Sequence, residues 1–146
     1  MNVEVLDQQK NIRIDTKQIK KITTKSLKHL KQHKDCALNI VFVSPYRIKQ
    51  LNKKYFKKNR VTDVIAIEPG KFDREIFNNY LGDIIICPQK AGENSKRFNT
   101  SLKNEVSLYI AHGILHLLGY DDLKEKDREK MERRQQELMS ISDSKE

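Results

Sequence analysis

Two histidines four residues apart mark the run AHGILHLLGYDDL as the part of the sequence best suited to chemistry. Because residues four apart share one face of an α-helix, His112 and His116 can direct two imidazoles at one point. Gly119 follows and can end such a helix in a left-handed conformation that reverses the chain. That reversal would return Asp121 or Asp122 toward the imidazoles. Three ligands of this kind leave a fourth position for water, so the pattern predicts a catalytic metal site.

Other interpretations of this spacing are weaker. Two histidines buried on an apolar helix without a metal or an acid partner would be costly to satisfy. The metalloprotease helix His-Glu-x-x-His-x-x-Gly-x-x-His has the same histidine spacing, but Gly113 stands here in place of its glutamate base. His29 and His33 are also four apart, yet lysines flank them and cations disfavour bound metal. We therefore interpret that second pair as a solvated helix face.

The size and the cysteine content of the chain limit its class. Its 146 residues predict one domain, residues 1–146, with a frayed tail from about residue 140. Cys36 and Cys87 are too few for a disulfide framework and are expected to be reduced core residues. No apolar run reaches the roughly 18 residues of a membrane span, and the first residues do not resemble a secretory signal. A cytoplasmic location without membrane contact is therefore expected.

Charge is distributed unevenly along the chain. Residues 1–62 hold 16 Lys and Arg against 4 Asp and Glu, a net charge of +12, whereas residues 63–146 have a net charge of −3. A basic half on a small protein suggests a polyanionic partner such as nucleic acid. The alternative is a lysine-rich surface that only contacts solvent.

Hydrophobic periodicity predicts an α/β (α+β) domain, a small mixed four-stranded sheet packed with about five helices. One of those helices is apolar nearly all round, so we expect it to be central, buried and the carrier of the metal site. Residues 68–81 give mixed signals and are expected to form a loop. The predicted strands cover residues 3–6, 37–43, 63–67 and 83–87, and the predicted helices cover 16–33, 45–55, 88–97, 102–118 and 123–139.

Three motifs together resemble the YbeY-type ribosomal RNA maturation factors. HGILHLLGYDD resembles that family's signature His-Gly-x-Leu-His-Leu-x-Gly-Tyr-Asp-His, and ten of the eleven positions agree, counting the two free ones. LNKKYFKKNRVTDVIAI resembles its segment Leu-Asn-x-x-Tyr-Arg followed by Thr-Asp-Val-Leu-Ser-Phe, and GDIIICP resembles its Gly-Asp-Ile-x-Ile-x strand. Glu105 stands where the family has an acidic residue seven before the first histidine. Order and spacing agree over about residues 38–131.

The resemblance implies a metal-dependent, single-strand-specific endoribonuclease that acts in ribosomal RNA maturation and ribosome quality control. It also implies an α/β fold whose central helix carries the metal, with zinc as the usual ion. By the same resemblance the substrate is single-stranded or ribosomal RNA, and proteins of the small ribosomal subunit are candidate partners.

The sequence departs from the family at functional positions. Asp122 occupies the third ligand position, where the family has histidine. A carboxylate oxygen is an acceptable zinc ligand, but it favours harder ions such as manganese and weakens the metal as a Lewis acid. Phe56 replaces the family's arginine, and Ala66 replaces its serine. Cations just downstream could supply the lost charge.

These residues suggest a division of roles. His112, His116 and Asp122 would hold one divalent ion, which the resemblance implies to be zinc. Arg60, or Lys57 as second choice, would stabilise the charge that develops on a phosphate during cleavage, since arginine presents a planar fork to phosphate.

Three further side chains complete the hypothesis. Lys58 joins Lys57 and Arg60 as a binder of the RNA backbone. Glu105 could hydrogen-bond a ligand imidazole or accept a proton, and otherwise it has a capping or surface role. Asp121 could orient a ligand from behind.

Two alternatives to the nuclease stay open. One is a metallohydrolase acting on another substrate, a peptide or a small phosphoester. The other is a non-catalytic adaptor that binds RNA or the ribosome, with a structural metal ion or none.

Overall fold

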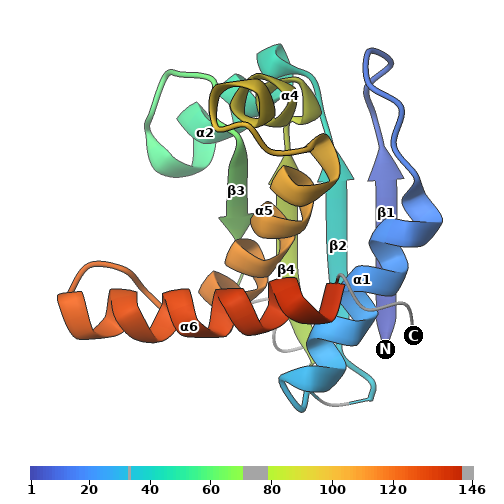
Figure 1. Cartoon of the computed structure of the whole chain (residues 1–146). Coiled ribbons are helices and arrows are strands. Elements are labelled where there is room, and N and C mark those ends of the chain that lie inside the picture. Colours follow the sequence, from blue (N-terminus) through green and yellow to red (C-terminus); the bar gives the residue numbers. More distant parts are fainter. Residues whose placement is uncertain (33, 71–78, 143–146) are drawn as a thin grey trace.

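The computed structural model describes residues 1–32, 34–70 and 79–142 of the chain, as shown in Figure 1. The elements follow one another as β1 (Asn2–Asp7), α1 (Thr16–His29), β2 (Ala37–Phe42), α2 (Pro45–Phe56), β3 (Val64–Ile67), β4 (Tyr80–Ile86), α4 (Pro88–Arg97), α5 (Leu102–Leu117) and α6 (Glu125–Ser142).

The four strands form one mixed sheet in the order β1-β2-β4-β3. β1, β2 and β4 run parallel, with Val5 opposite Ile40 and Ile40 opposite Ile84, whereas β3 pairs antiparallel with β4. β3 is therefore an edge strand. Its outer side has no strand partner in the described sheet and can border a site.

Alternating side chains divide the sheet into two apolar faces, as the period of two along a strand requires. One face packs against α1, α4 and α5, and the other face packs beneath α2. Each fully buried aliphatic side chain contributes roughly 1.5–3 kcal/mol. The first face includes Leu38, Ile40, Phe42, Ile84 and Ile86, all 0% exposed, and the second includes Ile65 and Ile85, which pack with Ile48 of α2.

Helix α5 lies at the centre of the molecule. It contacts β3, β4, α1, α4 and α6, and Figure 1 shows α6 crossing it on the side away from the sheet. Its first turn begins at Ser101, whose hydroxyl accepts a hydrogen bond from the Asn104 amide at 3.0 Å. At Gly113 a Cβ atom would lie 2.9 Å from the side chain of Ile84. Glycine therefore allows this helix to approach β4 closely.

The predicted class is confirmed, as is the central, buried position of the helix at 102–118. Both cysteines are buried free thiols. Among residues 1–32, 34–70 and 79–142, no helix is both long and apolar enough to cross a membrane.

The predicted boundaries of three segments were wrong. The first helix ends at His29 and not at residue 33, because Lys31 adopts a φ of 56° and the Gln32 amide donates to the Leu27 carbonyl at 3.0 Å. The second histidine of that lysine-flanked pair, His33, lies outside the described residues. The loop predicted over 68–81 ends early, since Tyr80 already pairs with Ala37 in the sheet. Residues 71–78 of that loop are not among those described.

The C-terminal helix was also placed two to three residues too early. It spans Glu125–Ser142 and not 123–139, so residues 140–142 are helical and not frayed. Leu138 is 1% exposed and Ile141 packs against the same apolar cluster, which holds the last turn on the body of the protein. The rest of the predicted tail, 143–146, falls outside the described part of the chain.

Candidate metal centre

His112 and His116 project from the same face of α5 and meet, as their spacing predicts. Their Nε2 atoms are 2.9 Å apart, and the rings form an edge-to-face pair with centroids 4.4 Å apart and an interplanar angle of 79°. Both side chains are half-buried. Two imidazole nitrogens thus converge on one point at the surface of the helix.

The exit from α5 brings an acid back to this point. Gly119 has a φ of +95°, a conformation that glycine adopts at little cost. The reversed turn is closed by two hydrogen bonds, from the Gly119 amide to the His116 carbonyl and from the Tyr120 amide to the Leu115 carbonyl, each 3.0 Å long. The helix therefore stops at the position that the sequence predicts, and the chain folds back.

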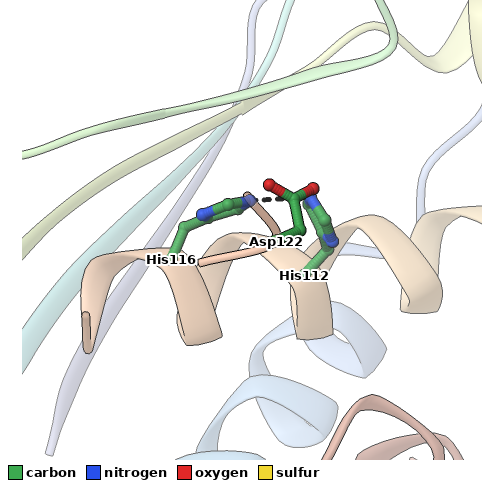
Figure 2. Close-up of side chains that lie close together, drawn as sticks. All are labelled: His112, His116 and Asp122. Carbon is green, nitrogen blue, oxygen red and sulfur yellow. Dashed lines mark hydrogen bonds between the residues drawn. The ribbon is translucent and has the colours of Figure 1, made fainter. Parts of the chain in front are cut away.

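Asp122, not Asp121, joins the two imidazoles. One ligand atom from each of His112, His116 and Asp122 lies within 4.8 Å of the other two, and Figure 2 shows the Asp122 carboxylate beside both rings. The Asp121 carboxylate instead accepts a hydrogen bond from the Leu123 amide at 3.2 Å. Asp121 thus shapes the turn, while Asp122 completes a three-ligand cluster.

Each imidazole has a partner behind it. The Nδ1 atom of His112 lies 3.1 Å from Oε1 of Gln135, which comes from α6. A carbonyl oxygen can only accept, so this contact places the proton on Nδ1 and leaves the Nε2 lone pair directed at the cluster. The His116 ring hydrogen-bonds the Tyr120 backbone. Such outer partners set the tautomer and the orientation of metal-binding histidines.

The electrostatic surroundings keep His116 neutral. Burial lowers the pKa of this imidazole most, and the neighbouring His112 lowers it further. Asp122, the Tyr120 backbone and Asp121 act in the opposite direction without reversing the shift. A neutral imidazole is the form that binds a metal, so the site is ready to bind one at neutral pH.

The donor set fits a divalent cation. Two imidazole nitrogens and one carboxylate oxygen form a set that zinc accepts in catalytic sites, where a fourth position stays open. Asp122 is exposed, so one side of the cluster faces solvent. Such an arrangement could bind a cation and, next to it, a water molecule or a substrate oxygen.

A cavity of about 670 Å³ opens beside the two histidines. The end of α2, the segment that follows it, β3 and α5 form its walls. Of the cations predicted to bind substrate, Lys58 and Arg60 line it, whereas Lys57 is not part of its wall. Its lining comprises Asn52, Tyr55, Phe56, Lys58, Arg60, Thr62, Asp63, Val64, Ile65, Ala66, Ile67, Glu68, His112, Gly113, His116 and Leu117.

One buried amide fixes the cationic segment at the rim of this cavity. Asn52 is 3% exposed, and its Nδ2 atom donates to the Arg60 carbonyl at 3.2 Å. The main-chain carbonyl of Asn52 accepts a hydrogen bond from the Lys58 amide at 3.3 Å, just after Lys57 takes a φ of 57°. The segment that carries Lys58 and Arg60 is therefore held by its backbone, and both side chains are exposed.

Glu105 lies away from the cavity, in the sealed first turn of α5. It is 4% exposed and stands seven residues, about two turns or roughly 10 Å, before His112. It lies near Tyr109, whose phenol accepts a hydrogen bond from Asn94 at 2.8 Å. Burial raises the pKa of Tyr109 to about 12, opposed by that hydrogen bond and assisted by the charges of Asp63 and Glu105. The predicted role of Glu105 in proton transfer stays a prediction.

Two residues of the site were missed by reasoning from the sequence. Gln135 lies in a helix that is polar on most sides, so nothing in its pattern indicates which side chain meets His112. Asn52 had a weak signal, because an amide that interrupts the apolar positions of a helix needs a hydrogen-bonding partner when it is buried.

Comparisons with known proteins point to a single family. A family model described as "Endoribonuclease YbeY" matches residues 4–142. A protein named endoribonuclease YbeY from Thermodesulfovibrio yellowstonii is 33% identical over an alignment of 154 positions, which covers 96% of each chain. Another from Staphylococcus epidermidis is 37% identical over 129 residues, covering 84% of this chain and 83% of the relative. A solution structure from Thermotoga maritima aligns with a TM-score of 0.65 and 27% identity, covering 96% of this chain and 88% of the other.

Proposed function

Because the chain belongs to the endoribonuclease YbeY family, we propose that it is a metal-dependent endoribonuclease that cuts single-stranded RNA in ribosomal RNA maturation and ribosome quality control. The observation that carries this proposal is the cluster of His112, His116 and Asp122 next to a cavity bordered by cations. A polyanion cut by a metal-assisted reaction needs both features in one place.

The three clustered side chains would hold one divalent ion, and we propose zinc. When bound, such an ion acts as a Lewis acid toward a phosphate oxygen and lowers the pKa of a bound water. Gln135 keeps His112 in the tautomer with a free Nε2 lone pair, and the Tyr120 backbone supports His116. Asp122 supplies negative charge from the solvent side, and this position favours a harder ion than a third imidazole would.

The cations on the cavity wall support the binding of phosphate. Lys58 and Arg60 line the same space as the two histidines, and the hydrogen bonds of Asn52 hold their backbone. Arg60 would bind the phosphate under attack through its planar guanidinium, while Lys58 and the nearby Lys57 follow the RNA backbone. The +12 charge of residues 1–62 favours the approach of any polyanion.

Cleavage of an end-labelled single-stranded RNA tests this proposal. The purified protein, made without a histidine tag, should cut the RNA with zinc, and EDTA should abolish the cleavage. His112→Ala should be inactive, whereas His29→Ala, which changes an exposed histidine paired with Glu137, should cut normally. RNA binding without cleavage in any metal would instead favour a non-catalytic adaptor. Hydrolysis of a peptide or a small phosphoester, but not of RNA, would favour a different metallohydrolase.

A role at the ribosome, in the cytoplasm, is the second part of the proposal. Family membership supports it, and the partners would be ribosomal RNA and proteins of the small subunit. Sedimentation of the labelled protein with purified small subunits checks this part. We expect binding that weakens steeply as salt rises, since contacts with phosphate release counterions.

A further inference from the structure

Two aromatic rings stand at the mouth of the metal-centre cavity. Tyr55 and Phe56 are the last two residues of α2, and they are 48% and 44% exposed. Both line the cavity that also contains His112 and His116. Large apolar side chains left open beside a polar site carry a cost in water, so their place at this rim calls for an explanation.

Cations surround these rings. Lys53 and Lys54 occupy the last turn of α2, and the Nζ atom of Lys54 lies 5.3 Å from the centre of the Tyr55 ring. Lys58 and Arg60 follow on the same cavity wall. An apolar face set among cations matches the two parts of a nucleotide, a flat base and a charged phosphate.

Two carboxylates share the wall of the cavity with these cations. Asp63 and Glu68 also line the cavity. The Asp63 carboxylate accepts hydrogen bonds from the Val64 amide at 2.8 Å and from Asn94 at 3.4 Å. Both oxygens of this carboxylate therefore already have hydrogen-bond donors within the protein.

We propose that Phe56, with Tyr55 beside it, is a stacking platform for an unpaired nucleobase of the RNA strand. The inference rests on the proposed function and specifies its substrate, a strand with an unstacked base next to the phosphate at the metal centre. Phe56 occupies the position where the family motif has an arginine. An arginine at this position would contact phosphate, whereas the Phe56 ring would contact the base. Lys58 and Arg60 would then supply the phosphate contact.

This geometry predicts a preference that charge alone does not give. A paired base is already stacked between its neighbours and cannot cover Phe56 without unstacking, which costs free energy. The platform should therefore favour single strands over duplexes of equal charge. It should also tolerate different bases, because every base has a π face.

A tryptophan reporter tests the platform directly, because the chain has no tryptophan of its own. Phe56→Trp places a fluorophore at the platform. Phe98→Trp is the matched control, since Phe98 is 60% exposed beside Arg97 but is not part of the cavity wall. The probes are 2′-O-methyl RNA octamers, either single-stranded, single-stranded with abasic central positions, or paired in a duplex. Each is titrated into the protein with zinc and again in EDTA.

Base stacking should quench the emission of Phe56→Trp with the single strand only. The abasic strand and the duplex should leave it nearly unchanged, and Phe98→Trp should respond to none of the three probes. Equal quenching of Phe56→Trp by the abasic strand would overturn the proposal, since that probe offers phosphate without the central bases.

Affinity measurements separate the base contact from the phosphate contact. Phe56→Leu keeps an apolar side chain but removes the ring, and it should weaken binding of the single strand by about 5- to 100-fold. The abasic strand should bind equally well to both proteins, and the salt dependence should not change. Lys58→Met should instead lower the slope of log affinity against log salt by about 0.7–0.9. An unchanged affinity of Phe56→Leu for the single strand would contradict the platform.

The two proposals can fail separately. If the protein cuts RNA but Phe56→Leu binds and cuts with unchanged KM, the platform is wrong and the nuclease stands. If selective quenching occurs and no metal supports cleavage, the platform stands and the nuclease is wrong.

Discussion

The two halves of α5 place ionisable side chains of one helix in opposite surroundings. The first half, residues 102–109, is sealed, and the second half, residues 110–117, is open. In the first half, Glu105 and Tyr109 are 4% and 5% exposed, and Asn94 of α4 donates a hydrogen bond to the Tyr109 phenol at 2.8 Å. In the second half, His112 and His116 are half-buried, and both line an open cavity.

This difference shows that access decides what an ionisable group can do. Burial raises the pKa of Tyr109 to about 12, so the phenol stays neutral and has a structural role. Burial also lowers the pKa of His116, but this residue lines an open cavity, where a neutral imidazole is the form that can bind a metal ion. The same physical cause therefore supports packing at one end of the helix and, at the other end, keeps an imidazole in the form that the candidate metal site needs.

Loss of an imidazole from the open half should have the largest effect. His116→Ala removes one of three ligands from a site whose total binding energy we expect to be on the order of 10 kcal/mol, so the zinc dissociation constant should rise at least about 100-fold. Cleavage should be lost with it. Isothermal titration with zinc measures the first effect, and circular dichroism checks the fold. Zinc affinity equal to that of the parent protein would remove His116 from the metal site.

Gln135 extends the open half onto α6, and its loss should have the next largest effect. Gln135→Leu keeps the approximate size of the side chain but removes the acceptor 3.1 Å from His112 Nδ1. Loss of such an outer partner typically weakens metal binding by about 10- to 100-fold. Gln136→Leu is the matched control, since Gln136 is exposed one residue further along the same helix. An equal loss of affinity in both variants would point to a general effect on α6 and not to His112.

Asp122 is where the open half departs from the family, so restoring the family residue tests the choice of metal. Asp122→His replaces a hard oxygen with a softer nitrogen, and the preference for zinc over manganese should rise by about tenfold. Competition between the two ions, followed by elemental analysis, measures the ratio. Asp121→His serves as control, because the Asp121 carboxylate bonds the Leu123 amide and is not part of the ligand cluster. An unchanged ratio in Asp122→His would show that Asp122 does not bind the ion.

The sealed half should respond through stability and not through metal binding. Tyr109→Phe removes the acceptor of the Asn94 hydrogen bond, which should cost about 1 kcal/mol and lower the Tm by about 3 °C at neutral pH. Zinc affinity should stay within about twofold of the parent value. A larger loss of zinc binding would show that the two halves are coupled.

Alkaline pH offers a second measurement on the same variant. The native pKa of Tyr109 is about 12, above its ordinary value of 10.0, so the unfolded state loses this proton first. The native state binds more protons between pH 10 and 12, and its free energy of unfolding should fall as pH rises through that range. The contribution is complete below pH 10. Denaturant titrations of Tyr109→Phe should show a weaker decline than the parent protein over the same interval.

Much of the open half could be predicted from the sequence, because its parts are local. Spacing of four places two imidazoles on one face of a helix, and a glycine at its end allows the chain to return. The helix, the turn and the acid lie within eleven residues, His112 to Asp122. The turn alone left Asp121 and Asp122 open, and the resemblance to the family motif selected Asp122, whose carboxylate lies beside the two histidines in the structure.

Long-range partners could not be predicted in the same way. Gln135 meets His112 only because α6 crosses α5, and the crossing of two helices is not encoded in the polarity pattern of either one. Sequence spacing also placed Glu105 on the face of His112, although two helical turns separate the two residues and Glu105 does not line the cavity. Helix ends were misplaced where a non-glycine residue such as Lys31 took a positive φ, because such a conformation is uncommon outside glycine.

Glu105→Gln is the variant with the smallest expected effect. It tests whether the sealed half of α5 takes no part in the reaction. A proton acceptor in cleavage typically contributes about 10²- to 10⁴-fold in rate. From its place in the sealed half we expect the cleavage rate of Glu105→Gln to stay within about threefold of the parent rate at saturating zinc. The charge of Glu105 helps to raise the pKa of Tyr109, so that pKa should fall in the variant, as read from tyrosinate absorbance. A hundredfold loss of rate with zinc affinity intact would place Glu105 in the reaction, and the division of α5 into a sealed half and a reactive half would then be wrong.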